Sequence, residues 1–175
     1  SLSIGNLNGQ GGWGSHSGTG TLPQQVAAGN LSYPGYGSSG IGNSVFLAGS
    51  GEDTNHPFPG IASGAAYEAA LINPSATFTG DYSFHFIDGA LAGNAFYGRV
   101  FIKQITLSTY QFGLQFKSKT GGANTVYYPT TFAVGTTHLI VVKYTFNAGT
   151  LNDKVELFVD PVVSQFSQSQ SISPA

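Results

Sequence analysis

The feature of this sequence that most restricts its fold is a two-residue period of apolar and polar side chains. In the stretch from Tyr110 to Lys117, YQFGLQFK, aromatic or aliphatic side chains occupy every second position. Because successive side chains of a β-strand point to opposite faces of its sheet, this alternation predicts a strand with one buried and one polar face. Further strands are predicted on the same grounds at 81–86, 96–103, 138–147 and 154–160.

Shorter stretches are weaker strand candidates, at 29–33, 44–48, 53–58 and 123–128. The segment 65–71, AAYEAAL, is ambiguous because it contains good helix formers. It is short, lies between Gly64 and Asn73-Pro74, and alternates, so we predict a strand there. About ten short strands separated by Gly, Asn and Asp turns predict an all-β fold, an antiparallel two-sheet β-sandwich.

The domain organisation follows from length and local composition. A chain of 175 residues suits one domain and can bury a core without disulfides or a metal. We predict a single β-sandwich domain over 1–163, of which 1–28 is a Gly-rich irregular N-terminal part. Residues 164–175, SQFSQSQSISPA, are predicted to be a polar tail or linker.

Charge restricts the partners and the location of the protein. Six Lys and Arg against eight Asp and Glu give a net charge of −2, and the basic residues are scattered, which disfavours nucleic acid. The absence of a long apolar run disfavours membrane insertion. Only 8% of residues are charged, which favours an extracellular or cell-surface protein, and the absence of Cys favours a bacterial one. The start at Ser1 is interpreted as a mature secreted product or an excised domain.

The C-terminal third carries a pattern with a family resemblance. Residues 137–144, THLIVVKY, are followed by a turn and by 155–161, VELFVDP. This resembles the strand pair of concanavalin A-like and laminin-G-like jelly rolls of secreted bacterial proteins, and 51–53, 80–86 and 98–101 are similar to their middle strands. The resemblance implies two antiparallel sheets in a family that includes lectins, glucan hydrolases and structural modules. The acidic-aromatic opening strand of the family is expected to be missing or cut off before Ser1, so one sheet edge is expected to be open.

No pattern of residues predicts catalysis. The jelly-roll glucanases carry acids at every second position of one strand, and here only Glu156 and Asp160 share a strand face. The sequence GSHSG resembles a nucleophile elbow, but its central residue is His16 instead of Ser. We therefore predict that the protein is not an enzyme, with a glycan-active enzyme as the least favoured alternative.

Carbohydrate recognition needs flat aromatic rings beside amides and other hydrogen-bonding groups. Tyr33 and Tyr36 flank Pro34-Gly35 in a Gly/Ser-rich loop, where a ring is hard to bury. The alternative for any tyrosine is core packing, because aromatic side chains bury large areas. The predicted ligand-binding residues are Tyr33, Tyr36, Tyr97, Arg99, His85, Gln111 and Gln115.

One structural calcium ion is predicted as the sole cofactor. Calcium takes carboxylate and carbonyl oxygens, and the resemblance implies an ion at the rim of the sandwich. The alternative is that these acids only cap turns. The candidate ligands are Glu52, Asp53, Asp88 and Asp160.

Two functions follow from this reasoning. The first is a non-catalytic extracellular recognition or adhesion module that binds a glycan or a cell-surface polymer. The alternative is a self-assembling structural subunit of a filament or surface layer. It would be a homo-oligomer in which residues 1–7 or 162–173 of a neighbour add a strand to the open edge.

Overall fold

The computed structural model of the chain is all-β and built from antiparallel strands, which confirms the all-β, antiparallel part of the predicted fold class. The structure describes residues 1–76, 79–89, 96–117, 124–149, 152–164 and 171–173. Within these residues, no helix is long and apolar enough to span a membrane. The chain divides into two compact units, Ser1–Gly60 and Ile61–Ala175.

The Ser1–Gly60 unit contains a three-stranded sheet and a separate strand pair. The sheet has the order β1 (Gly5–Asn6), β3 (Gln25–Ala27), β4 (Ser44–Phe46), and the pair joins β2 (Gly14–Ser17) to β5 (Asp53–Asn55). The buried apolar side chains of this unit are those of Leu7 and Val26. The predicted strands at 44–48 and 53–58 are confirmed in part as β4 and β5. The prediction at 29–33 is wrong, because Leu31 and Tyr33 accept backbone hydrogen bonds that close loops and form no ladder.

One sheet of the Ile61–Ala175 unit, the front sheet, is a meander. Its order is β10 (Thr125–Tyr127), β9 (Thr109–Lys117), β8 (Phe96–Thr106), β7 (Thr79–Ile87), and β11 (Phe132–Ala133) also pairs with β9. Each strand therefore pairs with the strand that precedes or follows it closely in the chain. The strands predicted at 81–86, 96–103 and 110–117 are confirmed here, and the one at 123–128 is confirmed in part as β10, with residue 123 outside the described residues.

The second sheet of this unit, the back sheet, combines distant parts of the sequence. Its order is β14 (Ser171–Ile172), β13 (Lys154–Val159), β12 (His138–Phe146), β6 (Gly64–Ile72). The ambiguous segment 65–71 is a strand, as predicted. β14 lies within 164–175, for which a polar tail was predicted; of that tail, residues 165–170 and 174–175 lie outside the described residues.

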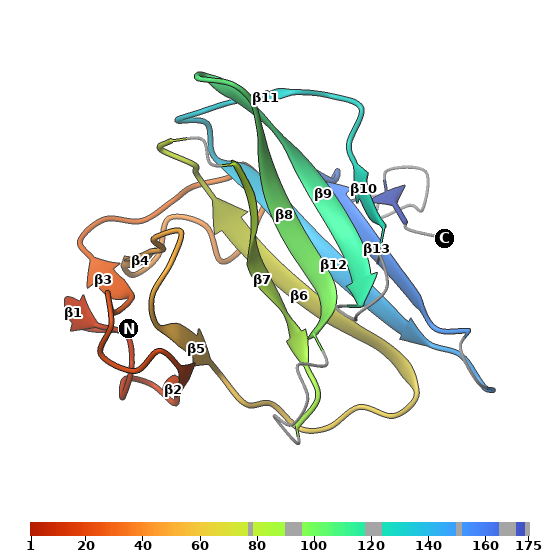
Figure 1. Ribbon diagram of the computed structural model, residues 1–175, viewed down its shortest axis with the longest axis horizontal. Coiled ribbons are helices and arrows are strands. Elements are labelled where there is room, and N and C mark those ends of the chain that lie inside the picture. Colours follow the sequence, from red (N-terminus) through yellow and green to blue (C-terminus); the bar gives the residue numbers. More distant parts are fainter. Residues whose placement is uncertain (77–78, 90–95, 118–123, 150–151, 165–170, 174–175) are drawn as a thin grey trace. The chain divides into compact units, whose positions relative to one another are not determined.

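The two sheets of the Ile61–Ala175 unit face each other across one hydrophobic core (Figure 1). Val100, Phe112 and Leu114 of the front sheet and Val142 and Leu157 of the back sheet have no accessible surface. At Gly98 the sheets approach so closely that a Cβ atom would lie 3.0 Å from Val142 Cγ1 and 3.1 Å from Val155 Cγ2. The apolar residues that alternate in the sequence therefore form the inward face of each sheet.

Candidate ligand-binding face

The side of the front sheet that faces away from the core gathers aromatic rings, amides and cations, and we name it the outer face. Arg99 on β8 lies opposite Gln115 on β9, and Lys103 lies opposite Gln111, so these four side chains share this face. Their neighbours Val100 and Ile102 point into the core instead. The described members of the outer face are Tyr82, His85, Phe96, Arg99, Phe101, Lys103, Gln111, Gln115, Thr125 and Tyr127.

An irregularity in β8 decides which aromatic side chains reach the outer face. Strict alternation would place Tyr97 on the same side as Arg99. Gly98 has a φ of +61° and points at the core, so Tyr97 points inward as well. The Tyr97 ring packs against Tyr144, with 5.7 Å between ring centroids. Tyr97 therefore lies on the opposite face from the other predicted ligand residues of this sheet, and Phe96 takes the outward position.

A second irregularity, in β7, brings Tyr82 outward. The sequence pattern predicts Tyr82, Phe84 and Phe86 on one inward face. The register with β8 shifts between Tyr82 and Phe84, because Ser83 is an extra residue whose hydroxyl donates to the Val100 carbonyl. Phe84 packs on the core, but Tyr82 lies beside Phe101 on the outer face. The expectation for Tyr82 is thus corrected.

Arg99 is the centre of the outer face. Its guanidinium carbon lies 3.9 Å from the centroid of the Tyr82 ring and 5.1 Å from that of Phe101, within the range of cation–π attraction. Its Nη1 donates to Gln115 Oε1 at 2.8 Å, and the Gln115 amide donates to Thr125 Oγ1 at 3.3 Å. This chain of contacts holds a planar cation over an aromatic ring.

A smaller group of residues extends the face toward β10. The Tyr127 ring lies directly on Gly113, where an added Cβ would meet the ring at 2.6 Å. Lys103 Nζ lies 4.8 Å from the centroid of that ring, and Gln111 donates to the Tyr128 carbonyl at 2.8 Å. Burial raises the pKa of Tyr127, so its hydroxyl stays protonated and can donate a hydrogen bond.

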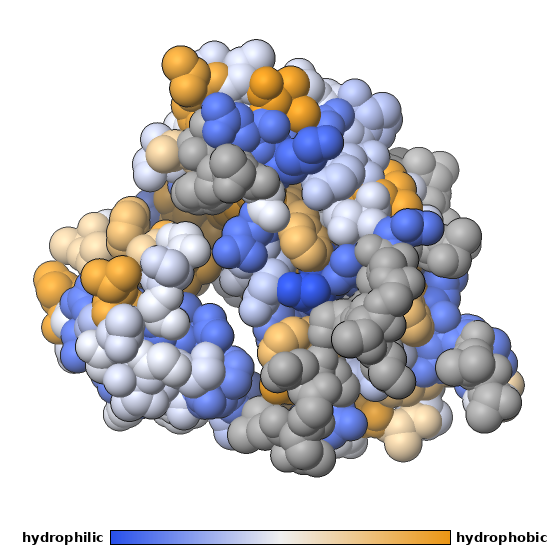
Figure 2. Space-filling model, in the orientation of Figure 1, coloured by the Kyte–Doolittle hydropathy of each residue, from blue (hydrophilic) through white to orange (hydrophobic). Residues whose placement is uncertain are grey.

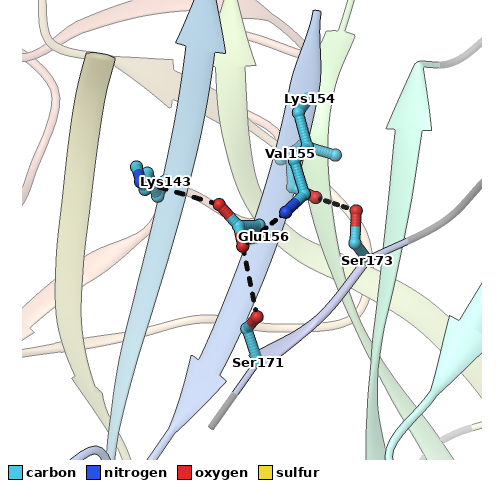
Figure 3. A network of polar contacts seen from close by, with 6 residues as sticks. All are labelled: Lys143, Lys154, Val155, Glu156, Ser171 and Ser173. Carbon is cyan, nitrogen blue, oxygen red and sulfur yellow. Dashed lines mark hydrogen bonds and ion pairs between the residues drawn. The ribbon is translucent and has the colours of Figure 1, made fainter. Parts of the chain in front are cut away.

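The outer face carries cations that no carboxylate of the described residues neutralises. Among the described residues, neither Arg99 nor Lys103 forms an ion pair. The lysines of the back sheet differ, because Lys143 and Lys154 lie 3.7 and 2.9 Å from the two oxygens of Glu156 (Figure 3). The same carboxylate accepts a hydrogen bond from Ser171 of β14 at 3.3 Å.

The structure brings together four of the seven predicted ligand residues, namely His85, Arg99, Gln111 and Gln115. The His85 ring stacks on Phe96 with 4.3 Å between centroids. Tyr33 and Tyr36 belong to the Ser1–Gly60 unit, where both are half-buried in a loop. Sequence reasoning missed Tyr82, Phe96 and Phe101 as outward aromatics. No pattern in the sequence marks the irregularities that place Tyr82 and Phe96 outward. Phe101 had a signal, because it alternates with Arg99 and Lys103.

The four predicted calcium ligands do not form one described cluster. Asp160 uses both oxygens, one 2.6 Å from His138 Nδ1 and one accepting the Leu139 amide. Asp53 accepts from the Ser17 hydroxyl, and Asp88 is exposed. Buried Glu52 accepts from the Asn8 amide through one oxygen, and its other oxygen has no hydrogen-bond partner in the described part of the chain.

The acidic and histidine residues of the described ranges include no group of three or more that could hold a metal. Both oxygens of Asp160 are already engaged, by His138 and by the Leu139 amide. The residues named for calcium thus do not fit one site on this geometry, and calcium binding stays a prediction.

Comparison with known proteins adds no assignment. No protein-family model, curated protein or solved structure matches the chain. The site therefore rests on the chemistry of the outer face itself. Figure 2 views this side of the front sheet and shows hydrophilic and hydrophobic side chains interleaved over β8 and β9.

Proposed function

We propose that the protein is a non-catalytic extracellular recognition module that binds a glycan through the outer face. We also propose that its sandwich is of the concanavalin A-like or laminin-G-like jelly-roll type. The observation that carries the function is the grouping of Arg99 with Tyr82, Phe101 and Gln115 on the face of the front sheet that points away from the core. These residues all lie on strands of the front sheet, where register shifts beside Tyr82 and Arg99 set the face on which each side chain lies.

The chemistry of this face suits a sugar. Aromatic rings and a planar guanidinium offer flat surfaces against which the C–H face of a pyranose can pack. Gln111 and His85 supply donors and acceptors for hydroxyl groups, and Arg99 and Lys103 supply further donors. Gln115 is buried and positions Arg99. A few polar groups fixed among apolar surfaces are typical of ligand sites in proteins.

The test is a glycan array followed by titration of the ligand that binds. Tyr82→Ala removes the ring on which Arg99 rests, and we expect it to weaken binding about tenfold, which corresponds to about 1.4 kcal/mol. The matched control is Tyr67→Ala, which removes a tyrosine that is 59% exposed on the back sheet. The control should bind as the wild type does.

Two results would contradict the proposal. One is an array without hits from protein that unfolds cooperatively and is therefore folded. The other is a glycan ligand whose affinity falls equally in Tyr82→Ala and Tyr67→Ala, because binding would then not depend on the outer face.

A further inference from the structure

The four lateral edges of the two sheets in the Ile61–Ala175 unit differ in how they are protected. β14, β10 and β11 are edge strands of two or three residues, and β7 is interrupted by three register shifts against β8. Short strands and bulges are the devices by which proteins prevent strand addition at an edge. β6 has neither device: it runs for nine residues and pairs with β12 in continuous register from Gly64 to Ile72.

The composition of β6 also leaves its edge open. The strand GAAYEAALI contains no Pro, Lys or Arg, and four of its nine residues are Ala. Among the described residues, its backbone makes no hydrogen bond apart from those to β12. Tyr67 and Ala69 are exposed. β6 thus presents a long, flat row of backbone donors and acceptors.

One side chain on β6 is without the partner that its burial requires. Glu68 lies opposite Val142, which is part of the core, so its carboxylate points between the sheets. Its Oε2 is buried and has no hydrogen-bond partner in the described part of the chain. A buried carboxylate is normally paired with a cation or saturated with donors. Burial raises the pKa of Glu68 to about 7.

We propose that the free edge of β6 binds an extended peptide segment as an added strand, and that this segment carries Lys or Arg opposite Glu68. Directly opposed residues in neighbouring strands have Cβ atoms about 5 Å apart, so a cation there reaches the carboxylate. Such strand addition draws affinity from the backbone ladder and specificity from alternate side chains.

The neighbours of Glu68 define the rest of the motif. Ala66 and Ala70 lie on the same inward face, two residues before and after Glu68. Because their side chains are small, the opposing positions have room for large apolar residues that extend the core. The added segment is therefore apolar two residues before and two residues after its Lys or Arg.

A second copy of β6 is not a suitable occupant. Glu68 is the central residue of β6, so an antiparallel pair centred on the strand would set two carboxylates against each other. Shifted registers do not help, because β6 contains no Lys or Arg. The partner is thus a different segment, and its charge is complementary to that of Glu68.

The test uses fluorescein-labelled TVTKTVT with the 175-residue chain, read by fluorescence anisotropy. The peptides TVTLTVT and TVTETVT are matched controls that differ only at the central residue. We expect TVTKTVT to bind about tenfold more tightly than TVTLTVT, from a charge-assisted contact, and TVTETVT not to bind. In Glu68→Gln the preference for TVTKTVT over TVTLTVT should disappear.

Backbone pairing is tested separately from charge. Alternate backbone amides of an added strand point toward β6, and the amides between them point away. Two peptides are therefore made from TVTKTVT, each N-methylated on one of these two sets of amides. The peptide methylated on the amides that point toward β6 should fail to bind, and the other should bind. Equal binding of the three unmethylated peptides, an unchanged preference in Glu68→Gln, or no effect of either methylation would each overturn the proposal. So would dimerisation of the chain through β6 on a sizing column.

Discussion

Buried carboxylates in this protein are accommodated in two different ways. Glu156, which is 1% exposed, is neutralised by Lys143 and Lys154 and accepts from Ser171. Glu68 has no such cation within the described residues, and the loss of water raises its pKa from 4.5 to about 7. The contacts of Glu156 connect β12, β13 and β14. Ionisation of Glu68, in contrast, lowers the stability of the folded state.

The effect of Glu68 on stability is predicted to depend on pH. Its pKa is higher in the folded than in the unfolded chain, so the folded state favours the neutral acid. Stability is therefore lost as pH rises from about 4.5 to about 7, and no further loss occurs above that. Relative to wild type, Glu68→Gln should gain up to about 3 kcal/mol of unfolding free energy between pH 4 and pH 8.

Urea denaturation of both proteins at pH 4, 6 and 8 measures this difference. The other titratable groups are the same in both proteins, so their contributions cancel in the difference between the two unfolding free energies. A gap between the two proteins that stays constant over this range would contradict the prediction.

At the scale of elements, the long strands of the Ile61–Ala175 unit were predictable, but the short strands and the faces of two long strands were not. The alternation in 110–117 predicted β9 because both its faces follow a strict period of two. In β8 and β7 the extra residues Gly98 and Ser83 break the period, so Tyr97 and Tyr82 lie on the faces opposite to those expected. Register shifts arise from contacts between strands, which a single strand's sequence does not display.

The irregularity in β8 predicts a large effect for Gly98→Ala. The added Cβ would stand 3.0 Å from Val142 Cγ1, and φ at this position is +61°. We expect about 2–4 kcal/mol of destabilisation, from backbone strain and overpacking together. The matched control is Gly135→Ala, whose φ is +78° and whose Cβ would meet nothing within 4 Å.

Thermal unfolding of the two variants separates these causes. Gly135→Ala carries backbone strain alone, so it should lose about 1 kcal/mol. An equal loss of stability in both variants would show that the sheets move apart at Gly98 to accept the added methyl group. The explanation from close packing would then be wrong.

At the scale of the molecule, burial is unequal between the two units. The hydrophobic core lies between two sheets formed from Ala66 to Leu157, entirely within the Ile61–Ala175 unit. In the Ser1–Gly60 unit the described buried apolar residues are Leu7 and Val26. The sequence predicted one sandwich domain over 1–163, because glycine-rich loops do not reveal how little apolar surface they bury.

This inequality leads to a prediction for truncated chains. Residues 61–175 expressed alone should unfold in one cooperative thermal transition, because their core needs no residue from 1–60. Residues 1–60 alone should show no such transition. Circular dichroism of both pieces and of the whole chain provides the measurement. A piece 61–175 without a transition would support the single domain predicted from the sequence.

The pairing of β6 with β12 has a consequence for the order of folding. The front sheet joins strands that are close in sequence, but Ile72 of β6 meets its partner His138 only after the whole front sheet has been synthesised. Contacts between distant residues form slowly, because loop closure must precede them. During synthesis the nascent strand 64–72 therefore waits unpaired, exposed to other nascent chains and to chaperones, until residue 138 emerges from the ribosome.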